Sequence, residues 1–161
     1  MNTGLIAEVE QVCRERGFRL TPLRADVLQL VAESARPVRA YEVLERIRES
    51  KAITAPPTVY RSLDFLLDNG FIHKLESINA FAACQSPRRP HIGTFLICDR
   101  CQATTEVIDE LLQHLLNIKS RAMGFALDAR SQTLEVHGSC EGCGSGVDGA
   151  RARTDDGPDL S

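Results

Sequence analysis

Two cysteine pairs of identical spacing are the strongest chemical feature of the sequence. Cys98 and Cys101 form one C-x-x-C pair, and Cys140 and Cys143 form the other. Four thiolates are the ligand set of a closed tetrahedral zinc site, and a two-residue spacer lets one turn aim both sulfurs at one ion. Disulfides and a redox dithiol are the alternatives, but nothing marks the chain as secreted. The sequence therefore predicts a structural zinc ion, because four protein ligands leave no position open for a substrate.

A second group of potential metal donors is spread through the middle of the chain. It consists of His73, Cys84, His91 and Glu106, and a site built from them would tie the two halves of the chain together. Each residue also has an ordinary alternative role. A lone cysteine is usually a small buried hydrophobe, and a lone histidine or glutamate is usually a solvated polar residue. Spacing alone leaves this site open.

The segment 57–63 predicts a helix with one side free to contact DNA. Apolar residues at 59, 63, 66 and 67 share one face, and at 100° per residue Arg61 points away from it. Arginine can bond a guanine edge bidentately, whereas serine and threonine mostly hold phosphates. The candidate DNA contacts are Tyr41, Thr58, Tyr60, Arg61 and Ser62. From this helix alone, a merely solvated face explains the pattern equally well.

The elements around this helix favour the DNA-binding interpretation. Helical apolar stripes begin near Leu5, after Thr21-Pro22 and after Pro37, and Pro56-Pro57 opens the helix just described. Two short strands, 71–75 and 80–83, follow Asn69-Gly70. Several helices followed by a small hairpin are the order of a winged helix-turn-helix.

The pattern changes after the proline-rich segment 86–90, which reads as a hinge. Strands are expected at 94–98 and 104–107 around the first cysteine pair, and Asp109 can cap a helix that ends near Gly124. We expect a second hairpin, 125–129 with 133–137, before the second cysteine pair. From Gly144 on, the sequence is poor in apolar residues and is expected to be a disordered tail.

Composition sets wider limits on the class of protein. The chain has 161 residues with 43% hydrophobic side chains, enough for one ordinary domain or two small ones. Its net charge of −3 gives no overall attraction to nucleic acid, so DNA contacts would depend on local patches. No apolar run approaches a membrane span, and the start does not look like a signal peptide. We therefore expect a cytoplasmic protein with no membrane partner.

Four short sequence motifs together resemble the ferric uptake regulator superfamily over nearly the whole chain. They are the segments 56–63 and 70–74 and the two cysteine pairs. Within that superfamily, the segments 58–67 and 95–101 are most similar to the zinc uptake regulator branch. The resemblance implies an α+β protein with an N-terminal winged helix-turn-helix domain (1–84), a hinge (85–91), and a C-terminal α/β dimerisation domain with an antiparallel sheet (92–144), followed by the disordered tail (145–161).

The resemblance also implies how such a protein would act. It implies a homodimer that binds palindromic double-stranded operator DNA when a regulatory zinc is bound, mainly as a repressor of zinc uptake genes. It implies two zinc ions per chain: a structural ion at the four paired cysteines, and a regulatory ion whose ligands match His73, Cys84, His91 and Glu106. Neither a catalytic residue nor a small-molecule substrate is implied.

One departure from the superfamily bears on which metal is sensed. Iron-sensing members typically carry a histidine-rich run with an aspartate before the first cysteine pair, where this chain has only His91 in the segment 91–95. A thiolate with two imidazoles and one carboxylate suits zinc, and the departure weighs against an iron site. The alternatives are a sensor of another metal or of peroxide, a zinc enzyme, and a thiol redox switch.

Overall fold

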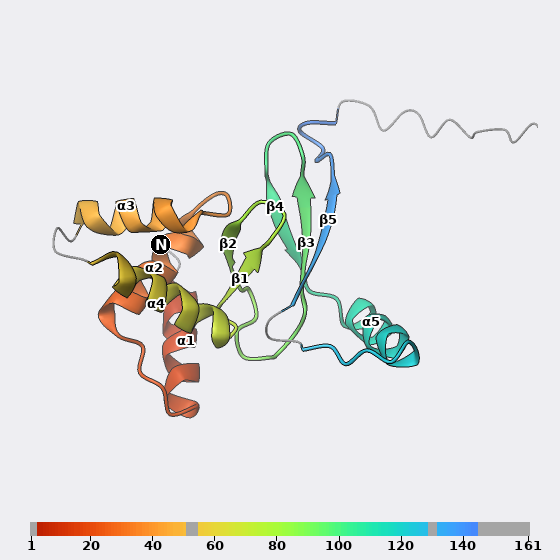
Figure 1. Cartoon of the computed structure of the whole chain (residues 1–161), viewed down its shortest axis with the longest axis horizontal. Coiled ribbons are helices and arrows are strands. Elements are labelled where there is room, and N and C mark those ends of the chain that lie inside the picture. The colour runs from red at the N-terminus through yellow and green to blue at the C-terminus, as the bar shows by residue number, and fades with distance from the viewer. Residues whose placement is uncertain (1–2, 51–54, 129–131, 145–161) are drawn as a thin grey trace, which may run out of the picture.

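The computed structural model describes residues 3–50, 55–128 and 132–144. The N-terminal part consists of α1 (Thr3–Glu15), α2 (Pro22–Glu33), α3 (Ala40–Ser50) and α4 (Pro56–Asp68), followed by β1 (Ile72–Leu75) and β2 (Ala80–Ala83). The C-terminal part consists of β3 (Gly93–Cys98), β4 (Thr104–Val107), α5 (Glu110–Ala122) and β5 (Thr133–Gly138). This order confirms the α+β fold with an N-terminal winged helix-turn-helix (Figure 1).

The local signals in the sequence explain where the helices begin and end. Thr21 caps α2 by accepting a hydrogen bond from the backbone N–H of Arg24, and Pro22 occupies the first turn. Asp109 caps α5 in the same way, accepting from the backbone N–H of Leu112 at 2.9 Å. Gly70 has a φ of 71° just after α4, a conformation that glycine adopts without strain.

The N-terminal helices enclose the larger of two hydrophobic cores. Its fully buried members include Val9 from α1, Val27 and Leu28 from α2, Val43 from α3 and Leu66 from α4. Ile72 and Phe81 of the β1–β2 hairpin also belong to it. The helical stripes predicted from the sequence therefore converge on one core, which holds α4 with its opposite side in solvent.

The C-terminal sheet differs from the expectation in one strand. Its order is β4-β3-β5, with β3 antiparallel to β4 but parallel to β5. The predicted second hairpin is wrong, because residues 125–128 form no strand and residues 129–131 lie outside the described part of the chain. The physical reason is the connection through α5. Because β4 ends beside the start of β3, α5 leads the chain across to the opposite edge of the sheet at that same end, and β5 therefore runs in the same direction as β3.

The β1–β2 hairpin, which we call the wing, lies between the N-terminal helices and the three-stranded sheet (Figure 1). Beneath it is the second hydrophobic core, in which Leu75 of the wing packs with Phe95 and Ile97 of β3. Ile78 and Ala82 cover this cluster. The wing thus belongs to the N-terminal fold by sequence and also packs on the C-terminal part.

The segment predicted as a hinge is held by contacts on both sides. Arg88 pairs with Glu8 at 3.2 Å and with Glu15 at 3.4 Å, both on α1. Arg89 pairs with Glu110 of α5 at 3.3 Å. These are exposed ion pairs that contribute little individually, so they guide the segment without fixing it.

Two other sequence predictions have limited structural counterparts. The predicted disordered tail, 145–161, lies outside the described residues. Among the residues that are described, no helix is both long enough and apolar enough to cross a membrane.

Candidate metal centres and nucleic-acid interface

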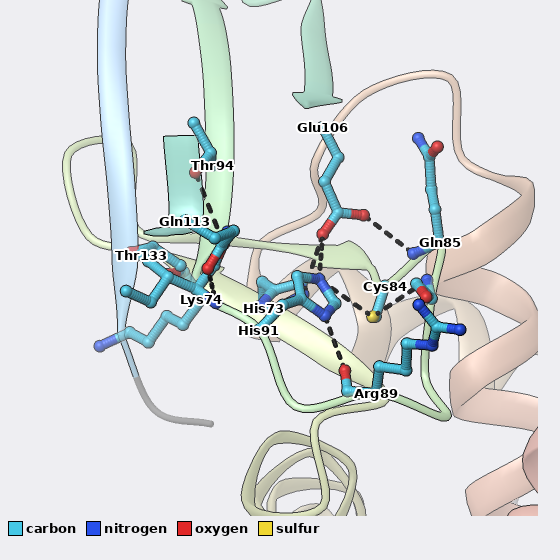
Figure 2. A network of polar contacts seen from close by, with 12 residues as sticks. His73, Lys74, Cys84, Gln85, Arg89, His91, Thr94, Glu106, Gln113 and Thr133 are labelled. Atoms are coloured by element: carbon cyan, nitrogen blue, oxygen red, sulfur yellow. Dashed lines mark hydrogen bonds and ion pairs between the residues drawn. The ribbon is translucent and has the colours of Figure 1, made fainter. Parts of the chain in front are cut away.

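The four scattered donors predicted from the sequence come together in one cluster. His73 lies in β1, Cys84 just after β2, His91 just before β3, and Glu106 in β4. One donor atom from each lies within 4.8 Å of all the others. Glu106 Oε1 is 2.9 Å from Nε2 of His91 and 3.1 Å from Nε2 of His73, and Sγ of Cys84 is 3.8 Å from Nε2 of His91 (Figure 2).

The cluster has the properties of a metal site and lacks those of a satisfied polar core. Nε2 of His73 is buried and makes no hydrogen bond, since its 3.1 Å contact with Glu106 is not aligned as one. Buried polar atoms without a partner are rare in folded proteins. Zinc bonds of ~2.0–2.3 Å in a tetrahedron place ligand atoms ~3.3–3.8 Å apart, close to the spacings seen here. The donor set therefore fits zinc.

The tautomer of His91 is also suited to metal binding. Nδ1 of His91 lies 2.8 Å from the carbonyl oxygen of Arg89, which can only accept. Nδ1 therefore donates, and Nε2 is left to face Cys84 and Glu106. Hydrogen bonds of this kind fix the ring orientation of ligating histidines and raise their basicity.

The electrostatics of the cluster show that its donors compete for protons. Burial alone would lower the pKa of His73, but the adjacent Cys84 and Glu106 outweigh it and raise the pKa to about 9. The hydrogen bonds of His91 with Cys84 and then Glu106 raise its pKa to about 10. Burial would raise the pKa of Glu106, but its contacts with His73 and His91 lower it to about 2. Without a metal, the positive charges of the protonated histidines therefore balance the negative charges of Cys84 and Glu106.

We expect zinc binding at this cluster to depend steeply on pH. Both imidazoles must lose protons to bind zinc, and their raised pKa values of about 9 and about 10 keep them protonated at pH 7. If two protons leave per ion, the apparent affinity rises by up to ~100-fold per pH unit between pH 7 and 8. Chelator competition at fixed ionic strength, repeated across this range, measures the slope, and a flat profile would contradict the assignment.

The same pKa shifts predict how the stability of the metal-free chain changes with pH. The raised histidine pKa values contribute stability that is complete below about pH 6.5 and is lost as the pH rises through about 9 to 10. The lowered Glu106 pKa contributes stability that is complete above about pH 4.5 and is lost as the pH falls through about 2. The metal-free cluster is therefore most stable between about pH 4.5 and pH 6.5, where both histidines are protonated and Glu106 is ionised.

Three supporting residues were not found by sequence reasoning. A Cβ atom at Gly93 would lie 2.7 Å from Nδ1 of His73, so only glycine leaves room for that ring. The backbone N–H of Gln85 donates to Oε2 of Glu106 at 2.8 Å. The side chain of Gln113 on α5 bonds both the N–H and the carbonyl of Ile92, next to His91. A lone glycine ahead of an apolar strand was the only available signal for any of them.

A cleft of about 450 Å³ reaches the cluster from solvent. It is lined from the N-terminal side by Leu5, Glu8 and Val31, and from the other side by Thr104 and Phe95, with Cys84 and Glu106 at its wall. The donor side chains at this wall are buried, since Cys84 is 0% exposed and the side chain of Glu106 is 1% exposed.

The four paired cysteines form the second cluster, also as predicted. One donor atom from each lies within 4.8 Å of the others, and Sγ of Cys101 is 3.7 Å from Sγ of Cys140. None of the six cysteines is in a disulfide, and 3.7 Å is the sulfur spacing of a tetrahedral zinc–thiolate site. Cys98 ends β3, Cys101 lies in the turn that leads to β4, and the second pair follows β5, so this site lies at the end of the sheet where these strands meet.

The thiols of this cluster differ sharply in acidity. Backbone N–H groups, first that of Cys140 and then those of Cys101 and Arg100, lower the pKa of Cys98 to about 6. The neighbouring sulfurs, Cys101 first, raise the pKa of Cys143 to about 12. The Cys98 thiolate therefore forms easily, whereas further thiolates are disfavoured by repulsion between negative sulfurs. A bound divalent cation would remove this repulsion.

The predicted DNA contacts lie on the open side of the helical core, with one exception. Thr58, Tyr60 and Arg61 are exposed near the start of α4, and Tyr41 is exposed near the start of α3. Ser62 is only 4% exposed, and its hydroxyl donates to the carbonyl of Thr58. Its position three residues after Val59 and four before Leu66 places it on the packed face, so its geometry does not support a direct DNA contact.

Comparison with known proteins places this arrangement in a family. The sequence model of the Ferric uptake regulator family matches residues 15–144. The chain belongs to this family. Among its members, the Zinc uptake regulation protein of Escherichia coli (strain K12) is 41% identical over 140 residues, covering 86% of this chain and 81% of the relative.

Solved structures of two family members have the same fold. The Zinc Uptake Regulator complexed with zinc and DNA has a TM-score of 0.78 at 41% identity, covering 88% of this chain and 93% of that one. Holo XcZur has a TM-score of 0.78 at 51% identity, covering 87% and 96%. Apo XcZur, of nearly equal identity at 50% and covering 88% and 96%, has a TM-score of only 0.52. The structure of this chain as a whole is therefore more similar to the holo form than to the apo form.

Proposed function

We propose that this chain is a zinc-responsive transcriptional regulator, mainly a repressor, that binds operator DNA as a homodimer and controls zinc uptake genes. DNA binding requires zinc at a regulatory site formed by His73, Cys84, His91 and Glu106. A second zinc, at the four paired cysteines, is structural. The protein acts in the cytoplasm, where its DNA is.

The observation that carries this proposal is the origin of the four regulatory donors. His73 lies in the wing and Cys84 directly follows it, whereas Glu106 lies in the C-terminal sheet and His91 lies just before that sheet begins. A metal bound at this cluster supplies positive charge that these donors otherwise take from protons. Filling the site therefore fixes the helices relative to the sheet, and domain orientation, DNA affinity and zinc affinity are linked by thermodynamic reciprocity.

An unpartnered apolar surface supports the homodimer. Helix α5 has no buried residue, and its side chains Leu111, Leu115 and Ile118 are 67%, 47% and 49% exposed. Leu96 of β3 and Val136 of β5 are 49% and 46% exposed. Exposed apolar side chains gathered on a helix and on a sheet are costly to leave in water and are typical of interfaces. We propose that a second copy of the chain covers it.

Pairing two chains would also explain how DNA is read. Each protomer would present one α4, whose exposed Tyr60 and Arg61 lie near its N-terminal end, where recognition helices meet base edges. A two-fold dimer matches a palindromic operator, with half-sites spaced by turns of the duplex. The exposed Tyr41 and Thr58 would hold the phosphate backbone.

The alternative functions fit the two clusters less well. A zinc enzyme needs an open coordination position, but each cluster offers four protein donors. A redox switch needs thiols that pair on oxidation, whereas the paired cysteines are spaced for a shared ion. A sensor of a harder metal would favour oxygen donors, and the regulatory cluster contains a thiolate.

The proposal is tested by counting zinc and selecting DNA with the same preparation. We expect two zinc ions per chain, one of which a mild chelator removes from an intact dimer. Selection from random duplexes at saturating zinc should then enrich a palindrome that the chelated protein does not retain. If the same palindrome is enriched equally with and without the removable zinc, zinc control is disproved, whereas the DNA-binding part of the proposal is retained.

Replacing Arg61 by alanine tests the reading helix. We expect Arg61→Ala to lower affinity for the selected operator by ~10- to 100-fold, the range for losing one bidentate guanine contact. Zinc content and dimerisation should not change, because Arg61 is an exposed residue of α4 and belongs to neither cluster. Fluorescence anisotropy at saturating zinc measures the effect, with Arg14→Ala, an exposed arginine on α1, as a matched control. An unchanged operator affinity would remove Arg61 from the interface.

A further inference from the structure

A second set of contacts joins the wing to the C-terminal sheet, separate from the regulatory zinc cluster. The carboxylate of Glu135 in β5 accepts hydrogen bonds from the backbone N–H groups of Glu76 and Ser77, at 2.8 and 3.1 Å. It also accepts a hydrogen bond from the hydroxyl of Ser77. Both wing residues lie in the turn between β1 and β2. We call these contacts the wing latch.

Neighbouring side chains of β5 extend the wing latch in both directions. The hydroxyl of Thr133 lies within hydrogen-bond distance, 3.3 Å, of the carbonyl oxygen of Lys74. Nε2 of His137 is 3.0 Å from the hydroxyl of Ser77, and its Nδ1 is 2.8 Å from Asp99, the residue after Cys98. Three alternate residues on one face of β5 thus hold the wing, and the last of them leads to the cysteine cluster.

The latch closes over an apolar contact that supports it. Leu75, immediately before the latch turn, is fully buried against Phe95 and Ile97 of β3. Opening the wing would therefore expose apolar surface and break the hydrogen bonds of Glu135 in the same movement. Hydrogen bonds to a charged group contribute more than neutral ones, so Glu135 is the strongest single polar contribution in this contact.

We infer that Glu135 is a positioning residue that holds the wing in the zinc-binding orientation and so sets how much zinc the regulator needs. This rests on the proposed function. A ligand's apparent affinity falls by the fraction of protein in the binding-competent state. The latch raises that fraction without touching the ion, because it brings β1, which carries His73, onto the sheet that carries Glu106.

The test is a zinc titration of Glu135→Ala with two readouts. Without DNA, chelator competition gives the zinc affinity of the regulatory site, and with operator, anisotropy gives the zinc concentration for half-maximal binding. We expect both to shift to higher zinc by the same factor, about 3- to 30-fold, as expected for loss of a partly exposed charged hydrogen bond. At saturating zinc, operator affinity should return to within about twofold of the parent.

Matched variants separate positioning from a general loss of fold. Glu10→Ala, an exposed glutamate on α1, should leave both titrations unchanged. Ser77→Ala should shift them in the same direction, and combining it with Glu135→Ala should add little, because the two residues share one contact. Hydrogen exchange at residues 75–78 in the chelated protein should be faster in Glu135→Ala than in the parent.

Three results would overturn the inference. These are unchanged zinc titrations in Glu135→Ala, a loss of operator affinity that saturating zinc does not restore, and loss of the structural zinc or of the dimer. The titration without DNA and the hydrogen exchange do not depend on operator binding. Failure of the parent to bind any operator would therefore disprove the proposed function while these two readouts still decide the role of Glu135.

Discussion

Cys84→Ser is expected to abolish zinc-dependent operator binding while leaving a folded dimer with one zinc ion per chain. Cys84 is fully buried and is the only thiolate of the regulatory cluster. Its nearest donor neighbours, His73 and His91, lower its pKa against the effect of burial, so the thiolate is readily available for a metal. Substitutions that only support a ligand cost ~10- to 100-fold in metal affinity, so loss of the ligand itself should cost at least ~100-fold.

The measurement is zinc affinity by chelator competition together with operator anisotropy across the same zinc range. Cys13→Ala is the matched control: Cys13 is also buried, at 1% exposure, but lies in the helical core and in neither cluster. We expect it to retain two zinc ions and to bind operator as the parent does. Normal operator binding by Cys84→Ser at limiting zinc would contradict the sensor assignment.

This prediction and the wing latch act on the same movement through different chemistry. The regulatory cluster and Glu135 both join the wing to the C-terminal sheet, but only the cluster responds to metal. Cys84→Ser should therefore be insensitive to added zinc over the working range, whereas Glu135→Ala should be rescued by it. The contrast separates a ligand from a residue that positions the ligands.

Much of this architecture could be predicted because its signals are local. The caps at Thr21 and Asp109 and the helical apolar stripes each depend on residues within a few positions, and the structure has the elements they predict. The two-residue spacing within each cysteine pair was itself enough to predict a zinc site. His73, Cys84, His91 and Glu106 had no such spacing, so the residues alone left their shared site open. The family resemblance favoured the site, and the structure brings the four donors together.

The errors and omissions have physical causes. The second hairpin was inferred from two apolar runs around 129–132, but direction in a sheet is set by the crossover through α5, which those runs do not encode. Ser62 was assigned by residue type, although its spacing from Val59 and Leu66 already placed it on the packed face. The close approach of Gly93 to His73, and of Glu135 to Ser77, joins distant positions and becomes visible only in three dimensions.

Cys143→Ser is expected to have the largest effect on stability. Cys143 follows the last strand and forms part of none, so its replacement removes a zinc ligand without altering a strand. The cysteine cluster joins the turn between β3 and β4 to the end of β5, and no other described helix or strand follows β5 to hold it. Loss of a structural metal is among the few single changes that cost more than ~4 kcal/mol.

We expect Cys143→Ser to contain at most one zinc ion per chain, to melt ~10 °C or more below the parent, and to lose the dimer. Calorimetry, zinc analysis and sedimentation measure the three effects. Ser139→Ala, an exposed neighbour, should behave as the parent. Cys143→His separates the metal from the thiol, because three cysteines and one histidine also form a closed tetrahedral zinc site. Recovery of zinc and dimer in Cys143→His identifies the ion as the stabilising group, whereas equal loss in both variants would show that the thiol itself is what this end of the sheet requires.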